Sequence, residues 1–157
     1  MPLSKIISGG QTGVDRAALD VALALSINCG GWCPAGRRAE DDSIDVRYPL
    51  QETPSDEYAQ RTEWNVRDSE GTLIITDGPL TGGTLFTKIC AERLNKPCWI
   101  SETKESLDVE GFWRWLKTNR IETLNVAGPR ESHRPGIYEQ AKALVQRLLG
   151  DPEQRGE

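Results

Sequence analysis

The sequence predicts an α/β protein, a Rossmann-like three-layer sandwich with a mostly parallel sheet of about five strands. Short apolar segments that read as strands alternate with segments of helical periodicity along the chain. This alternation is typical of a parallel sheet covered by helices. A strand, a glycine-rich loop and a helix also follow one another three times, at residues 8–14, 76–85 and 127–137. We expect these loops to share one edge of the sheet.

The first strand is expected at residues 3–8 and the first helix at residues 14–26. Thr12 and Asp15 match the start signal in which a hydroxyl and an acid three residues later cap a helix. The helix is apolar on two sides, which predicts burial on both. In a chain of this size one side could face another subunit, so Leu19→Asp or Leu23→Asp is expected to break an oligomer.

A second strand is expected at residues 28–33, followed by a long irregular loop at 34–55. Loops of this length in compact domains are often functional, although a solvated excursion explains the composition equally well. The segment Thr53–Asp56 resembles a helix start with a proline in the first turn. The polar helix that it opens is expected to end near Asp68, with a solvated face or with residues that line a site.

The rest of the chain continues the alternation. The run GTLIIT at residues 71–76 is nearly continuous in apolar residues and predicts a strand covered on both faces. The remaining elements are expected at 84–94 (helix), 97–100 (strand), 109–119 (helix), 123–127 (strand) and 136–149 (helix). The length of 157 residues fits one domain, which we place at residues 1–150, with a polar tail at 151–157.

Composition narrows the function. The net charge is −5 and the pI about 5.0, which argues against nucleic acid as a partner because phosphate backbones are bound by basic surfaces. No targeting segment is apparent, and the longest apolar stretch, residues 17–27, is too short to span a membrane and contains Asp20. We therefore expect a cytoplasmic protein.

The four cysteines form no C-x-x-C pair and His133 is the only histidine, so a structural zinc site is not expected. Cys90 and Cys98 are interpreted as core residues. Cys33 follows a strand at a loop mouth, where contact with a ligand is an alternative to burial. His133 is interpreted as a loop residue rather than a catalytic base, and no residue is assigned a catalytic role.

The three glycine loops indicate an anion site. Glycine lets the backbone approach a ligand closely, and the helix that follows each loop directs free N–H groups and a positive dipole end at it. Neither G-x-G-x-x-G nor G-x-x-x-x-G-K-[ST] occurs, which disfavours a standard dinucleotide enzyme or P-loop NTPase. The candidate binding residues are Gly10, Gln11, Thr12, Gly13, Arg16, Arg37, Thr81, Gly82, Gly83, Thr84, Gly128, Arg130, Glu131 and Ser132.

Several long motifs resemble those of the molybdenum cofactor carrier proteins. They are ISGGQTGVDRAALD (7–20), GWCP (31–34), GRRAED (36–41), RTEWNVRDS (61–69), GPLTGGT (78–84) and NVAGPRES (125–132). The resemblance covers residues 6–149 and carries no motif in the segment 102–115. It implies a Rossmann-like fold related to lysine-decarboxylase-like and cytokinin-activating proteins.

The resemblance further implies a ligand and partners. The ligand would be the molybdenum cofactor, a pyranopterin dithiolene with a terminal phosphate, stored, protected and delivered to molybdoenzymes as acceptors. A homo-oligomer is implied, with a tetramer the first expectation. The ligands of the metal stay unassigned, and glycine loops alone do not distinguish a pterin phosphate from a nucleotide phosphate.

The alternative is a nucleotide-binding or nucleoside-monophosphate-hydrolysing relative. Cytokinin-activating enzymes use a G-G-x-G-T-x-x-E loop, and the comparable segment here is Gly82–Thr87, with Thr87 where the glutamate is expected. Threonine supplies no carboxylate for an oxocarbenium-like transition state or for water activation. Hydrolysis would therefore need Glu40 or Glu63 at the pocket.

Overall fold

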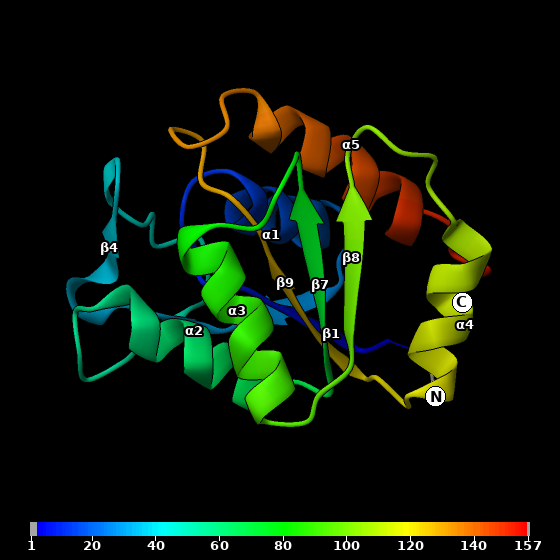
Figure 1. The fold of residues 1–157 in the computed structure, drawn as a ribbon, viewed down its shortest axis with the longest axis horizontal. Coiled ribbons are helices and arrows are strands. Elements are labelled where there is room, and N and C mark those ends of the chain that lie inside the picture. The colour runs from blue at the N-terminus through cyan, green and yellow to red at the C-terminus, as the bar shows by residue number, and fades with distance from the viewer. Residues whose placement is uncertain (1–2, 157) are drawn as a thin grey trace.

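The computed structural model describes residues 3–156, so the ends of the predicted domain (residues 1–2) and of the predicted tail (residue 157) lie outside the described residues. Figure 1 shows the elements in their spatial order. In chain order they are β1 (Lys5–Ile7), α1 (Val14–Ala24), β2 (Asn28–Gly30), β3 (Trp32–Cys33), the 3-10 helix η1 (Ala35–Arg37), β4 (Arg38–Ala39), β5 (Asp42–Ser43), β6 (Gln51–Glu52), α2 (Tyr58–Arg67), β7 (Gly71–Thr76), α3 (Gly82–Arg93), β8 (Cys98–Glu102), α4 (Val109–Thr118), β9 (Thr123–Ala127) and α5 (Ile137–Leu149).

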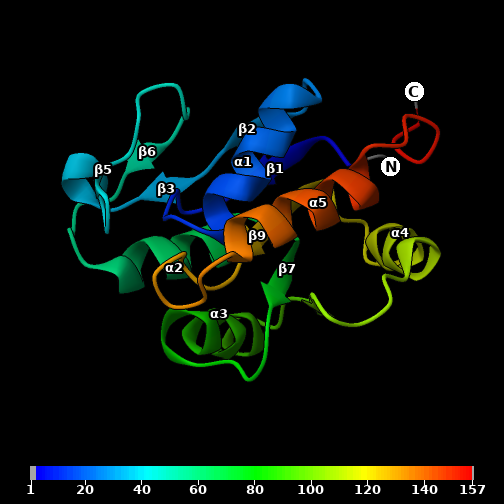
Figure 2. The same cartoon turned by 90° about the horizontal axis from the view of Figure 1, so that it is seen from above.

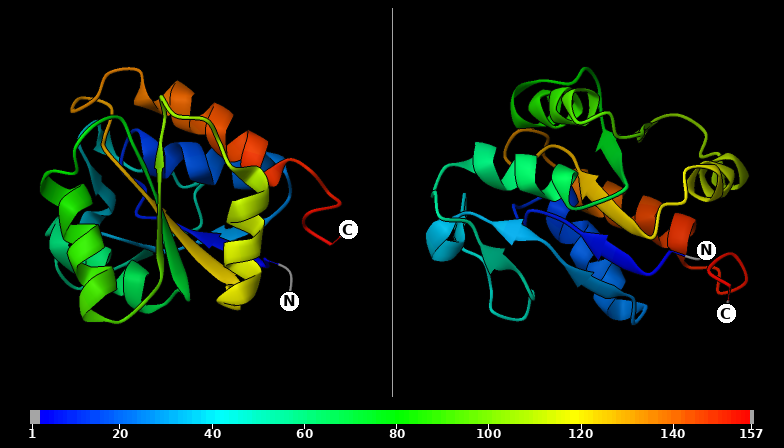
Figure 3. Two further views of the ribbon diagram at one scale, coloured as in Figure 1. Left: turned by 45° about the vertical axis from the view of Figure 1, so that its right-hand side comes forward. Right: turned by 90° about the horizontal axis from the view of Figure 1, so that it is seen from below.

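The predicted α/β sandwich is confirmed. Five parallel strands form the central sheet in the order β2-β1-β9-β7-β8. Helices α1 and α5 lie together on one face, α2 and α3 on the other, and α4 lies beside the β8 end (Figures 2 and 3). Ile7 is in register with Asn125, and Ile74 with Ala127. The loops that follow β1, β7 and β9 therefore leave from one edge of the sheet.

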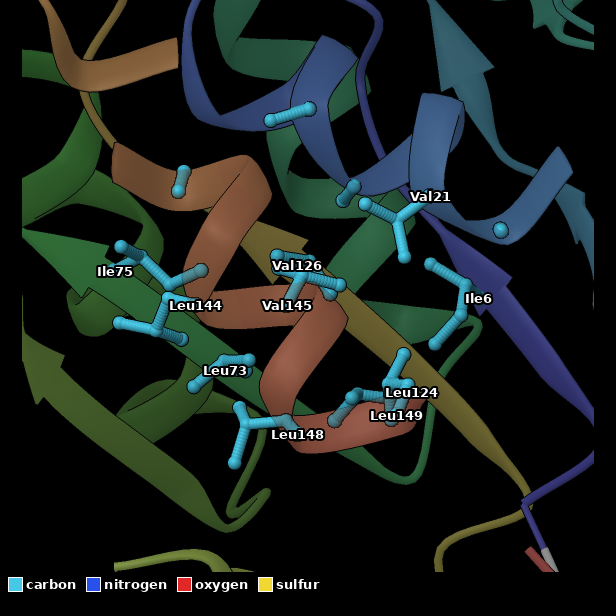
Figure 4. Close-up of a cluster of buried hydrophobic side chains, with 14 of the residues drawn as sticks. Ile6, Val21, Leu73, Ile75, Leu124, Val126, Leu144, Val145, Leu148 and Leu149 are labelled. Carbon is cyan, nitrogen blue, oxygen red and sulfur yellow. The ribbon is translucent and has the colours of Figure 1, made fainter. Parts of the chain in front are cut away.

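The main core fills the space between the sheet and helices α1, α5 and α4. Figure 4 shows side chains from β7 and β9 meeting those of α5 and α1 in this cluster. All six residues of β7 are buried, as the apolar run predicts. Leu73 and Ile75 point to this core, and Thr72 and Ile74 alternate to the opposite face because side chains alternate along a strand.

A second apolar cluster corrects the interpretation of α1. Leu19 has no exposed surface and packs with Cys33, Ile44, Tyr48 and other residues of the segment after β2. The second apolar side of α1 is thus covered largely by residues 34–55 of the same chain, a segment called the excursion below. Leu23, at 42% exposure, is the large apolar residue of that helix that remains open to a partner.

The segment predicted as an irregular loop is partly ordered. It contains η1, the β4–β5 hairpin and β6, which pairs with β3. The predicted strand 28–33 is interrupted at Gly31, whose φ is +125° and where a Cβ would lie 2.4 Å from the Ser8 carbonyl oxygen. Short strands without apolar alternation leave little sequence signal, so the sequence pattern predicts no helices or strands in this region.

Two predicted helix starts are wrong. Thr12 does not cap α1: the N-cap residue is Gly13, and the Asp15 carboxylate instead accepts from the backbone N–H of Gln11 at 3.3 Å. Helix α2 begins at Tyr58 rather than near Pro54. The Thr53 hydroxyl donates to the carbonyls of Cys33 and Ser55 and so holds a turn instead of a helix end.

The described part of the tail, residues 151–156, forms turns. Arg155 is 8% exposed, and its guanidinium donates to the Leu149 carbonyl at the end of α5. Among residues 3–156, no helix combines the length and apolar character needed to cross a membrane.

Candidate functional site

The glycine loops meet around a pocket of about 390 Å³ at the carboxyl edge of the sheet, the place where open α/β sheets bind ligands. Helices α2 and α3 form one wall, and the β9–α5 loop forms another. Seven of the predicted site residues line it: Gln11, Thr81, Gly82, Gly83, Thr84, Gly128 and Arg130.

The start of α3 is the most open part of this wall. The N-cap residue Thr81 makes no capping hydrogen bond through its side chain, so it leaves the first amides of the helix to another partner. A Cβ placed on Gly82 or Gly83 would meet nothing within 4 Å. The glycines at this helix start therefore leave space that the rest of the chain does not fill.

The glycines of the other two loops have a packing role. A Cβ on Gly13 would lie 2.4 Å from the Pro129 carbonyl oxygen, and one on Gly128 would lie 2.2 Å from the carbonyl oxygen of Ile75. Gly10, at φ +79°, packs against Leu50 and Ile44. These glycines let the β1–α1 and β9–α5 loops touch each other and the chain around them, which explains them without a ligand.

A buried ion pair forms part of the pocket and was not predicted. Arg61 of α2 donates from Nη1 to Asp15 of α1 at 2.9 Å, with side-chain exposures of 13% and 7%. Burial raises the pKa of Asp15, while the Arg61 charge and the hydrogen bonds to the carboxylate oppose that shift. Arg61 is the first residue of the RTEWNVRDS motif, so the sequence marks this arginine, but only the fold shows that it pairs with Asp15.

Two buried amides present unpaired groups to the pocket. Gln11 is 6% exposed and its Oε1 accepts from the N–H groups of Thr12 and Glu40, which leaves its Nε2 without a partner among residues 3–156. Asn125 of β9 is 3% exposed and donates from Nδ2 to the Thr72 hydroxyl at 3.3 Å. Its Oδ1 accepts no hydrogen bond from the described part of the chain. Both residues line the pocket, so these two polar atoms can bind water or a ligand there.

Glu40, from the turn of the β4–β5 hairpin, joins the β1–α1 and β9–α5 loops. Its carboxylate accepts from the hydroxyls of Thr12 and Ser132 and, at 3.2 Å, from the Ser132 N–H, and Arg130 Nε lies 3.6 Å away. Partial burial raises the pKa of Glu40, but these hydrogen bonds and the Arg130 charge outweigh it, so the pKa lies below its usual value. Thr12 and Ser132 thus contact a carboxylate of the chain itself.

The other predicted arginine and acid positions lie away from this pocket. Arg16 pairs with Asp41 and lines, with Thr12, Gly13 and Glu131, a neighbouring pocket of about 620 Å³. The Glu131 carboxylate accepts hydrogen bonds from the N–H groups of Gly136 and Tyr138 and so satisfies free N–H groups at the start of α5.

Arg37 has a structural role in the excursion. Its guanidinium donates to four carbonyls, those of Ile44, Asp45, Tyr48 and Leu50. The structure therefore does not bring Arg37 to the ligand pocket, because the loop it was expected to leave free is folded around it. Cys33 is fully buried, which makes it a core residue and not a ligand contact.

Few side chains at the pocket could act as the acid or base of a hydrolysis reaction. Thr87 is buried and its hydroxyl donates to the Gly83 carbonyl at 3.0 Å. Neither Glu40 nor Glu63 lines the pocket, where Asp15 is the one carboxylate among the described lining residues. His133 lies in the β9–α5 loop with Nε2 3.1 Å from the Thr81 hydroxyl. Within residues 3–156, no group of three or more His, Cys, Asp or Glu side chains is arranged to hold a metal ion.

Fold and pocket together define a Rossmann-like α/β protein with a pocket at the carboxyl edge of its parallel sheet. Residues 6–149 match the model of the circularly permutated YpsA SLOG family, and the chain belongs to this family. It is also 44% identical to a protein from Syntrophus aciditrophicus SB, described as a putative molybdenum carrier protein, whose crystal structure superimposes with a TM-score of 0.88. That similarity covers 94% of this chain and 96% of the other.

These findings confirm the resemblance to molybdenum carrier proteins that the motifs indicated. The comparison with curated proteins gives no significant match.

Proposed function

We propose that this protein is a carrier of the molybdenum cofactor and holds the phosphate-bearing pyranopterin in the pocket between α2, α3 and the β9–α5 loop. The observation that carries the proposal is the open start of α3, where Gly82 and Gly83 leave amides and space unused by the chain. The 44% identity to a protein described as a putative molybdenum carrier supports the nature of the cargo.

The phosphate fits the start of α3. Backbone N–H groups and the positive end of the helix dipole favour an anion there, and the glycines allow it to approach the backbone. Arg130 lines the same pocket, is 46% exposed at its side chain and adds a positive charge to the pocket. This local arrangement supplies an anion site on a protein whose net charge is −5.

The pterin ring fits the deeper part of the pocket. The unpaired Nε2 of Gln11 is a donor and the unpaired Oδ1 of Asn125 is an acceptor. A pterin carries both acceptors and donors along its ring edge, so it can satisfy both groups. Phe86 of α3 also lines the pocket and provides an apolar surface for a ring.

A nucleotide has the same two features, a phosphate and a hydrogen-bonding ring, and is the alternative ligand. Hydrolysis of it is disfavoured because Asp15, the pocket's carboxylate, is bound to Arg61 at 2.9 Å. A carboxylate held in that way is a poor general base.

The test is anaerobic purification from cells that make the molybdenum cofactor, with molybdenum and oxidised-pterin fluorescence measured on the same fraction. The decisive variant is Gly83→Leu, because a side chain at this open position projects into space that the ligand would fill. We expect molybdenum and pterin in equimolar amount with the wild-type chain and neither in the variant. Thermal stability should be kept, since leucine favours a helix by up to about 1 kcal/mol over glycine.

Arg93→Leu, an exposed change at the other end of α3, is the matched control and should retain the cargo. Absence of molybdenum and pterin from the wild-type protein, together with stabilisation by AMP, would replace the carrier proposal by a nucleotide-binding one.

A further inference from the structure

Glu40 occupies a cluster of hydrogen-bond donors that is suited to an oxyanion. The donors are the hydroxyls of Thr12 and Ser132, the Ser132 backbone N–H at 3.2 Å, and the Arg130 guanidinium, whose Nε lies 3.6 Å from the carboxylate. Hydroxyls, backbone amides and arginine are the groups that proteins use to bind phosphate and related anions. The chain fills this cluster with a carboxylate of its own.

The Glu40 carboxylate belongs to the β4–β5 hairpin, which is not part of the central sheet. The β4–β5 hairpin has two residues in each strand and lies outside the central sheet, at the left of Figure 1. Its tip, residues 40 and 41, is joined to the body by the Glu40 contacts, by the Glu40 N–H that donates to Gln11 Oε1 at 2.9 Å, and by the Arg16–Asp41 pair, while the strand residue Ala39 is buried in the apolar cluster around α1. The contacts of the tip itself are therefore polar, and Glu40 provides several of them.

The donor cluster lies between the two pockets. Arg130 and Gln11 line the smaller pocket, and Thr12 lines the larger one. Gln11 is 6% exposed, its Oε1 is held by the Glu40 and Thr12 amides, and its Nε2 remains an unpaired donor beside the cluster. An oxyanion that entered from the smaller pocket would find donors on both sides of the place where Glu40 sits.

We propose that Thr12, Arg130 and Ser132 form a tetrahedral-oxyanion subsite, and that Glu40 occupies it as an internal mimic which phosphate or molybdate displaces. The inference rests on the proposed function: with the phosphate of the cargo at the start of α3, this subsite takes the second anionic end of the same cargo, and inorganic phosphate and molybdate are probes for it. Binding of the oxyanion would release the hairpin tip, and loss of the oxyanion would let Glu40 return. Loading of the cargo is thereby coupled to the position of the hairpin.

The test measures the affinity of inorganic phosphate and of molybdate, each alone, by isothermal titration calorimetry on the full chain. The variant Glu40→Gln removes the competing charge at nearly constant shape, and Glu40→Ala removes the side chain. Both should bind the anions about tenfold or more tightly than wild type, since one charge-assisted competitor has been removed. Glu63→Gln, which removes an equal charge from an exposed position on α2, should bind as wild type does.

The gain should disappear in Glu40→Gln combined with Ser132→Ala, because the hydroxyl donor is then missing. Equal or weaker anion binding in both Glu40 variants, with circular dichroism showing both folded, overturns the inference and leaves Glu40 as a structural link between loops. This outcome is separable from failure of the carrier proposal. If the wild-type protein carries no pterin yet the Glu40 variants gain anion affinity, the subsite stands and the cargo is reassigned.

Discussion

Asp15 and Arg61 show how one pair of side chains links the fold to the pocket. Arg61 crosses from α2 to α1 over Gly9, where a Cβ would lie 1.8 Å from Nη1. A side chain at position 9 would therefore displace the Arg61 guanidinium from its place beside Asp15. The pair is almost fully buried, so each charge depends on the other for compensation of its lost hydration.

Arg61→Ala is expected to lower the free energy of unfolding at pH 7 by about 3–5 kcal/mol, since it leaves the Asp15 carboxylate buried without its partner. Adding Asp15→Asn should restore part of the loss by removing that charge. Urea denaturation of the wild type, both single variants and the double variant measures the coupling. An additive double variant would mean that the two side chains act independently.

Helix α1 carries two leucines with different surroundings, and we expect mutation to aspartate to change the stability of the protein much more at one than at the other. Leu19 is enclosed by the excursion, so Leu19→Asp buries a charge and should cost more than about 3 kcal/mol of stability. Leu23 is 42% exposed, and Leu23→Asp should change stability by within about 0.5 kcal/mol.

If the predicted oligomer uses this face of α1, Leu23→Asp lowers the mass measured by light scattering while the protein stays folded. A wild-type oligomer whose mass Leu23→Asp leaves unchanged would place the subunit contact elsewhere. Leu19→Asp cannot report on the oligomer, because its first effect is on the fold.

The elements that could be predicted from sequence are those with a strong local pattern, either a continuous apolar run or a helical period. The six buried residues of β7 and the apolar stripe of α5 follow from local pattern alone, and the order of strands and helices follows from their alternation. The glycine loops could be placed at one sheet edge because parallel strands end together. The β4–β5 hairpin has no such pattern, since two-residue strands bury too little to leave one.

Contacts between distant segments could not be predicted. Arg61 meets Asp15 across 46 residues, and Glu40 meets Ser132 across 92. A local sequence pattern contains nothing about such pairs. For this reason the sequence suggests Glu40 only as a substitute catalytic acid and Glu131 as a ligand contact, whereas the Glu131 carboxylate accepts hydrogen bonds from the N–H groups at the start of α5.

For the whole molecule, these contacts bring segments that lie far apart in the sequence together around the pocket. The excursion covers α1 through Leu19 and reaches the loops through Glu40 and Asp41. The β9–α5 loop is held from one side by Glu40 and from the other by the close packing at Gly13. The contacts between the excursion and these loops therefore include the carboxylates of Glu40 and Asp41, whose charge depends on pH.

The stability of this arrangement is expected to fall in acid. Arg16 holds the pKa of Asp41 below its usual 3.8, and the hydrogen bonds at Glu40, against partial burial, hold that pKa below its usual 4.5. A carboxyl group whose pKa is lower in the folded state stabilises the fold above the unfolded pKa and loses this contribution as the pH falls through the folded value. Asp15 acts in the opposite sense, because burial raises its pKa.

The contribution of Glu40 can be isolated by comparing wild type with Glu40→Gln in urea denaturation between pH 7 and pH 3. Glu40 is 18% exposed at its side chain, so after solvent screening we expect the wild type to be more stable by on the order of 1 kcal/mol at pH 7. The difference should shrink below pH 4.5, where the glutamate begins to be protonated in the unfolded chain. Glu63→Gln should follow the wild-type curve throughout. A difference at Glu40 that stayed constant with pH would show that its contacts act through shape rather than charge, and the hairpin tip would then be held at any pH at which the protein folds.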